Sequence, residues 1–181
     1  MDTLGLLELT SIAGGIEIVD AMLKVANVKL VFAKASCPGK YYIILNGKVA
    51  DVEKAVALGV SRGGGFVVSS GVISRVHEQV IKAINGTAMP EKPLAIGVME
   101  FFSVMSSIAA ADTAVKAARV EIVDLRLGTG IGGKSFVVVT GDPASVNSAV
   151  EAASRPMLDS GMLVNKIVIA NPRKELIESL L

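Results

Sequence analysis

The sequence has few residues of the kinds that carry chemistry: its 181 residues include one cysteine, one histidine and no tryptophan. A single cysteine excludes an intramolecular disulfide framework. No triad, metal-ligand spacing or acid–base pair occurs, so the chain is not expected to be an enzyme. Cys37 is therefore a buried apolar residue, a reactive thiol, or a ligand whose site is completed by other chains.

The sequence also lacks an excess of charge of either sign, because 18 basic side chains are balanced by 17 acidic ones. Without a run of Lys or Arg, a nucleic-acid partner is not expected. No apolar run approaches the roughly 18 residues that a membrane span needs. Asp2 stands where a signal peptide would carry positive charge. We therefore expect a cytoplasmic protein with no membrane contact, and the apolar fraction of 51% is ample for a buried core.

The chain contains an internal repeat. Residues 5–34 align with 97–126 at an offset of 92, and the offset becomes 94 after the glycine-containing loops. Matching pairs include Gly5/Gly97, Glu8/Glu100, Ser11/Ser103, Asp20/Asp112, Lys24/Lys116, Lys40/Lys134, Gly47/Gly141 and Ala55/Ala149. Two structural units of the same kind are therefore predicted.

Each repeat has the same expected order of elements. Apolar spacing and β-branched runs in the first repeat predict strands at 5–9, 28–34, 41–45 and 65–73, helices within 12–26 and 46–60, and a short terminal helix at 77–84. This order is β-α-β-β-α-β, an α/β (α+β) arrangement in which an antiparallel sheet carries its helices on one face. We predict two ferredoxin-like domains, 1–88 and 89–181, joined by the Asn-Gly and proline-containing linker 85–93.

One stretch, GTGIGGKS, fits the phosphate-binding pattern G-x-x-x-x-G-K-S, with Gly128, Gly133, Lys134 and Ser135 in the defining positions. Such a loop works because it leads into a helix whose N-terminus holds the phosphates. Here the next residues are FVVV, which read as a strand, and Lys134 is the repeat partner of Lys40. Nucleotide binding is therefore not predicted.

Several segments carry a family resemblance. GLLEL, DAMLKVANV, the glycine loop before a strand, NGKVADVEKAV and VIANPRKEL together resemble the BMC domain of bacterial microcompartment shell proteins, over essentially the whole chain and twice. The tandem arrangement resembles the trimeric shell proteins. The resemblance implies a homotrimer that forms a pseudohexameric tile in the shell of a cytoplasmic microcompartment. It also implies other shell proteins as neighbours and lumenal redox enzymes as partners.

The SCPGK loop resembles that of iron–sulfur-binding propanediol-utilization members of this family. The resemblance implies a 4Fe-4S cluster in a central pore, held by Cys37 from three chains and used for electron transfer. A three-fold axis would bring three thiolates to one point. Lys34 and Lys40 would offset the negative charge of such a cluster. The residues expected to line the pore are Ser36, Pro38, Gly39, Lys40, Gly128, Thr129, Gly130, Ile131 and Gly132.

At the tile edge, Lys24 and Lys116 occupy the position of the family's edge lysine, although surface lysines are ordinarily only solvated. The arginine of the family's R-P-H pattern corresponds to Arg75 and, in the second repeat, to Asn171. The two edges are therefore expected to differ.

Three functions stay open at this point. The first is a shell tile with a cluster, the second is a tile whose metal-free pore passes small molecules, and the third is a trimeric regulatory protein that binds a small molecule. His77 has no partner at ligand spacing, so a capping or surface role is expected for it.

Overall fold

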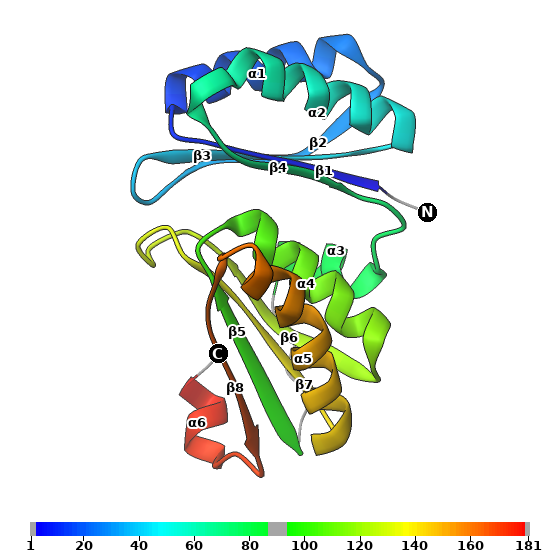
Figure 1. Ribbon diagram of the computed structural model, residues 1–181, viewed down its shortest axis with the longest axis vertical. Coiled ribbons are helices and arrows are strands. Elements are labelled where there is room, and N and C mark those ends of the chain that lie inside the picture. The colour runs from blue at the N-terminus through cyan, green and yellow to red at the C-terminus, as the bar shows by residue number, and fades with distance from the viewer. Residues whose placement is uncertain (1–2, 87–93, 180–181) are drawn as a thin grey trace. The chain divides into compact units, whose positions relative to one another are not determined.

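The computed structural model describes residues 3–86 and 94–179, which form two compact units (Figure 1). Of the described residues, the first unit takes those up to Val76 together with Gly128–Gly133, and the second takes the others. The predicted boundary at residues 88 and 89 lies outside the described residues, as does most of the predicted linker.

The first unit is a four-stranded antiparallel sheet in the order β2-β3-β1-β4. Both long helices cover the same face of this sheet (Figure 1). Its elements are β1 (Thr3–Leu9), α1 (Ile12–Val25), β2 (Val28–Ser36), β3 (Lys40–Gly47), α2 (Val49–Gly63), a short 3₁₀ helix (Gly64–Phe66) and β4 (Val67–Ile73). The predicted β-α-β-β-α-β order is confirmed.

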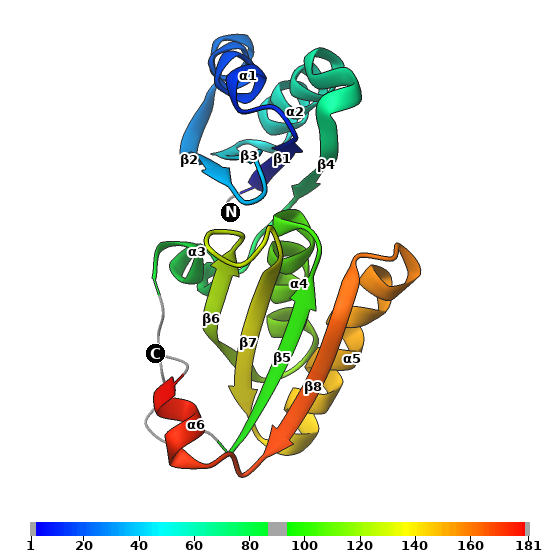
Figure 2. The same cartoon turned by 90° about the vertical axis from the view of Figure 1, so that its left-hand side faces the viewer.

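The second unit repeats this plan in the order β6-β7-β5-β8. It consists of α3 (Glu78–Asn85), β5 (Ala95–Phe101), α4 (Val104–Ala117), β6 (Val120–Leu127), β7 (Ser135–Gly141), α5 (Pro143–Asp159), β8 (Leu163–Ala170) and α6 (Lys174–Ser179). Helices α4 and α5 lie behind the sheet in Figure 2. The helix α3 follows the last strand of the first repeat, yet its contacts place it in the second unit.

Glycines at equivalent positions let a helix approach the central strand closely in both units. A Cβ atom on Gly5 would lie 2.7 Å from Val52 Cγ1 of α2, and one on Gly97 would lie 2.5 Å from Val150 Cγ2 of α5. Any larger residue would push the helix away from a close-packed core. The valines themselves are buried, so the repeat preserves a packing contact and not only a pattern.

Serine side chains begin the first long helix of each unit. The Ser11 hydroxyl accepts from the Gly14 N–H at 3.1 Å, and the Ser103 hydroxyl accepts from the Ser106 N–H at 3.5 Å. Both serines stand at the N-cap, where they satisfy backbone donors that the helix leaves without a partner.

Candidate functional site: the Cys37 turn

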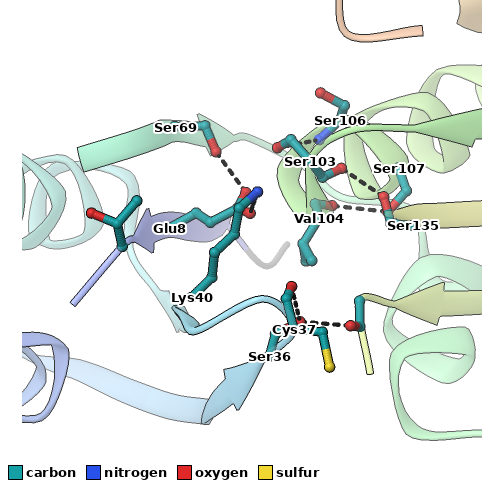
Figure 3. A network of polar contacts seen from close by, with 12 residues as sticks. Glu8, Ser36, Cys37, Lys40, Ser69, Ser103, Val104, Ser106, Ser107 and Ser135 are labelled. Atoms are coloured by element: carbon teal, nitrogen blue, oxygen red, sulfur yellow. Dashed lines mark hydrogen bonds and ion pairs between the residues drawn. The ribbon is translucent and has the colours of Figure 1, made fainter. Parts of the chain in front are cut away.

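Cys37 lies at the tip of a tight turn between β2 and β3, and its side chain is exposed. Ser36 and Lys40 pair at the end of the strand ladder, and the Gly39 N–H donates to the Ser36 carbonyl at 3.0 Å. Gly39 has a φ of 84°, which glycine adopts readily. The turn therefore presents the thiol outward, and Figure 3 shows its sulfur pointing away from the Glu8–Lys40 pair.

The glycine loop Gly128–Gly133 packs against this turn within the first unit. The Ser36 hydroxyl, which is buried, donates to the Gly128 carbonyl at 2.7 Å. The hydroxyl groups of Tyr42 and Thr129 lie 3.4 Å apart. These contacts fasten one end of the glycine loop beside the cysteine.

The other end of the glycine loop touches the turn backbone. Gly133 has a φ of 79°, and a Cβ atom there would lie 2.4 Å from the Cys37 carbonyl oxygen and 2.6 Å from Pro38 Cδ. A contact this short with a backbone atom cannot be relieved by rotating a side chain. Glycine at position 133 is thus required both by its backbone conformation and by the space available.

The glycine loop connects two strands, as the sequence predicted, because β6 ends at Leu127 and β7 begins at Ser135. Lys134 Nζ donates to Glu100 Oε1 at 2.8 Å. The lysine that a phosphate-binding loop would use to bind phosphate is therefore paired with a carboxylate. The loop is followed by a strand and not by a helix N-terminus, so the prediction that GTGIGGKS joins two strands is confirmed.

Below the turn lies an ion pair that the sequence did not predict. Lys40 Nζ is 2.9 Å from Glu8 Oε1, and the Ser69 hydroxyl donates to Glu8 Oε2 at 3.0 Å (Figure 3). The Glu8 side chain is only 3% exposed and that of Lys40 is 18% exposed. The equivalent pair, Lys134 with Glu100, is 44% and 34% exposed.

The ion pair gives the charge of Lys40 a partner inside the first unit. Glu8 lies in the central strand β1, directly opposite Tyr42 of β3, and its carboxylate balances the Lys40 ammonium. Lys34, the other flanking lysine, has its ammonium 5.3 Å from the centre of the Phe32 ring. Glu8 stands out in the sequence only as the repeat partner of Glu100. The register that places it beside Lys40 could have been found from the alignment of the predicted strands.

The predicted edge residues have distinct surroundings. Lys24 pairs with Asp20, four residues away, at 2.5 Å on an exposed helix face, whereas the equivalent pair of Lys116 with Asp112 has a buried carboxylate. Arg75 and Asn171 both have positive φ, 52° and 49°, just after the last strand of their repeats. Asn adopts this conformation more readily than Arg.

His77 is the N-cap of α3, and its Nδ1 accepts from the Gln79 N–H at 3.3 Å. The capping role expected for it is confirmed. Among residues 3–86 and 94–179, no three His, Cys, Asp or Glu side chains come together in a way that could hold a metal ion. Within those same ranges, no helix is both long and apolar enough to span a bilayer.

Comparison with known proteins identifies the fold of both units. The BMC domain matches residues 3–76 and again 95–172. The chain belongs to the BMC domain family of bacterial microcompartment shell proteins. It is 45% identical over 173 residues to the bacterial microcompartment shell protein PduT of Citrobacter freundii, which covers 96% of this chain and 94% of that protein.

A solved structure and a second relative agree with the assignment. A microcompartment protein from Desulfitobacterium hafniense DCB has a TM-score of 0.88 and 46% identity, covering 98% of this chain and 99% of that one. The carboxysome assembly protein CcmO of Synechococcus elongatus is 28% identical over 174 residues, 89% of this chain and 62% of CcmO. The two BMC domains seen in the repeat are therefore confirmed in fold and in family.

Proposed function

We propose that three copies of this shell protein form one six-domain tile, and that their Cys37 turns meet at a central pore and hold a 4Fe-4S cluster. The observation that supports this proposal is the exposed thiol at the tip of a turn that is fixed on both sides. A cysteine with only a packing role would be buried in an apolar cluster.

The residues of one chain fit a cluster that several chains bind together and not a cluster bound by one chain alone. Iron–sulfur clusters are held by cysteine thiolates, and this chain contains one. A three-fold axis multiplies that thiol to three, and a fourth iron site is then left for a group other than cysteine. The neighbouring loop, Gly128–Gly133, includes four glycines, so it adds little bulk beside the cysteine.

The cluster, when bound, would supply one-electron transfer between the two sides of the shell. The chain's own residues would then have structural tasks. Ser36 and Gly133 fix the position of the Cys37 turn, and Glu8 fixes Lys40 at its base. Lumenal redox enzymes would exchange electrons with the pore, and neighbouring shell proteins would meet the tile along edges that contain Lys24 and Lys116.

The proposal is tested by anaerobic purification of the wild-type protein beside Cys37→Ser, with measurement of mass in solution, iron per chain and visible absorbance. Serine keeps the size of the side chain and removes the thiolate. The expected result is a trimer with about four irons per three chains and a broad absorbance near ~400 nm. The variant should lack the iron and the absorbance.

Other outcomes separate the alternatives. A trimer that stays colourless and free of iron after anaerobic reconstitution would contradict the cluster and favour a metal-free pore for small molecules. A protein that does not form trimers would contradict the tile itself. A trimer that forms no sheets and binds a small molecule saturably would favour a regulatory protein.

A further inference from the structure

Helix α3 makes a contact within the second unit, and the repeat supplies a second helix and a second surface of the same kind. In the second unit, α3 packs beside the edge strand β6 (Figure 2). The His77 N–H donates to Asp112 Oδ1 of α4 at 2.8 Å. The Gln79 side chain accepts from the Ile122 N–H at 2.9 Å and donates to the Val120 carbonyl at 3.5 Å. Val80 is fully buried by this arrangement.

Helix α6 is the repeat counterpart of α3. Arg75 and Asn171, which share positive φ, are 96 residues apart, and the same offset relates the first residues of the two helices, Glu78 and Lys174. Val80 and Leu176 correspond at this offset, and each is followed by an isoleucine. Yet the described side chains of α6 are all exposed or half-buried, in contrast to the buried Val80 of α3.

The surface that receives α3 also has a counterpart, in the first unit. At an offset of 92, Asp112, Val120 and Ile122 correspond to Asp20, Val28 and Leu30. Ile122 is 6% exposed beneath α3, whereas Leu30 is 43% exposed. The strand β2 that carries Val28 and Leu30 is an edge strand of its sheet, as β6 is. A helix of the α3 type therefore has an equivalent place to dock on β2 and α1.

We propose that α6 of one chain docks on β2 and α1 of the next chain, in the way that α3 docks on β6 and α4. This inference rests on the proposed tile, because a head-to-tail contact of this kind closes into a ring when it is repeated by rotation. The occupant is a second copy of this chain, since α3 already covers the equivalent surface of the second repeat and leaves the one on β2 and α1 exposed.

The polar groups at the proposed contact are complementary. Asp112 uses Oδ2 for Lys116 and Oδ1 for the His77 N–H. Asp20 uses Oδ2 for Lys24, and its Oδ1 would accept from the backbone N–H of Arg173 at the start of α6.

One difference between the two contacts follows from chemistry. Glu175 replaces Gln79, and a carboxylate can accept from the Leu30 N–H but cannot donate to the Val28 carbonyl. The contact between chains would therefore have one fewer hydrogen bond from this side chain than the contact within the chain.

Engineered disulfides test the proposal in a Cys37→Ser background, which has no other cysteine. Asp20→Cys with Arg173→Cys places one thiol on each side of the proposed contact. His77→Cys with Asp112→Cys does the same for the contact within the chain and serves as the matched control. Each pair is oxidised, and masses are read under denaturing, non-reducing conditions, while the mass of the native background protein is measured in solution.

The control pair is expected to form a disulfide and keep the mass of one chain. The test pair is expected to join chains covalently up to trimers. A native trimer in which the control pair closes but the test pair gives no link between chains would overturn the docking of α6 and leave the tile intact. A link within one chain would also overturn it. A monomeric background protein would overturn both the tile and the docking.

A second measurement does not depend on new cysteines. Leu176→Asp should weaken trimer association by about tenfold or more on dilution, because it puts a charge into the contact where α3 buries Val80. Leu158→Asp on α5, where the leucine is also exposed, is the control and should leave association unchanged. Equal dissociation of the Leu176→Asp variant and the wild type would overturn the proposed contact.

Discussion

Replacing Gly133 by alanine should displace the Cys37 turn from the glycine loop. Alanine adds one methyl group at a position whose φ is 79°, and that methyl would lie 2.4 Å from the Cys37 carbonyl oxygen. The nearby Gly132 provides a matched control, because its φ is 65° but no atom lies within 4 Å of its added Cβ. Both variants place alanine in a left-handed backbone conformation, but only Gly133→Ala brings its methyl group against the Cys37 turn.

The magnitudes follow from these two terms. An alanine in the left-handed region costs roughly 1–2 kcal/mol. Overpacking against a backbone that cannot rotate away costs a further ~1–3 kcal/mol. Gly132→Ala should therefore lower the free energy of unfolding by the first amount, and Gly133→Ala by the sum of both. The difference between the variants measures the contact with Cys37 and Pro38.

Two assays check this reasoning. Urea unfolding at one fixed protein concentration gives the stability difference, since assembly makes stability depend on concentration. The rate at which a thiol reagent labels Cys37 reports on the turn itself and should change in Gly133→Ala but not in Gly132→Ala. If both variants lose the same stability and label at the same rate, the packing of Gly133 on the Cys37 turn is refuted.

Two further predictions concern charged side chains. Glu8→Gln should lower stability by about 2–3 kcal/mol, less than a fully buried pair because Lys40 is 18% exposed, whereas the half-exposed equivalent Glu100→Gln should cost under about 1 kcal/mol in urea unfolding. The pKa of Asp142, the N-cap of α5, is lowered mainly by the Ser145 side-chain hydrogen bond and then by the Ser145 backbone N–H. Its stabilisation is therefore present above the unfolded pKa and is lost as the pH falls through the folded one. Asp142→Asn keeps a capping oxygen but does not titrate, so the wild type should lose melting temperature relative to this variant between pH ~5 and pH ~2, and parallel curves would contradict this.

The sheets and long helices could be predicted because local pattern and repeat agree. Alternating and β-branched runs mark the strands, and the offset of 92 gives each assignment a second, independent copy. The unit to which α3 belongs could not be predicted in this way. Its amphipathic pattern shows that one face is buried, but periodicity does not say which sheet covers that face. The hydrogen bonds of Gln79 with β6 settle that question only in three dimensions.

The sequence predicts the exposed turn of the site but not the contacts that other segments make with it. The exposed turn at Cys37 followed from Pro38 and Gly39 between two strands. The contact of Gly133 with that turn joins positions 96 residues apart, and a glycine-rich loop has no side-chain pattern from which to read its neighbour. The repeat does not reveal the Glu8–Lys40 pair, because it relates Glu8 to Glu100 and carries no information about the adjacent strand.

In the proposed trimer, the tandem arrangement would let a tile of six similar domains carry a site with three-fold symmetry. Both repeats keep the ion pair at the base of the loop, but only the first places a thiol at the tip, since Cys37 is the only cysteine. In the proposed tile, a ring of identical single domains would bring six thiols to the pore, whereas tandem chains bring three. The second repeat contributes glycines at this place, and Gly133 packs against the Cys37 backbone where any side chain would collide. The number of thiolates at the axis would thus be set by the asymmetry of the repeats, and it matches a cubane cluster with one iron site left for another ligand.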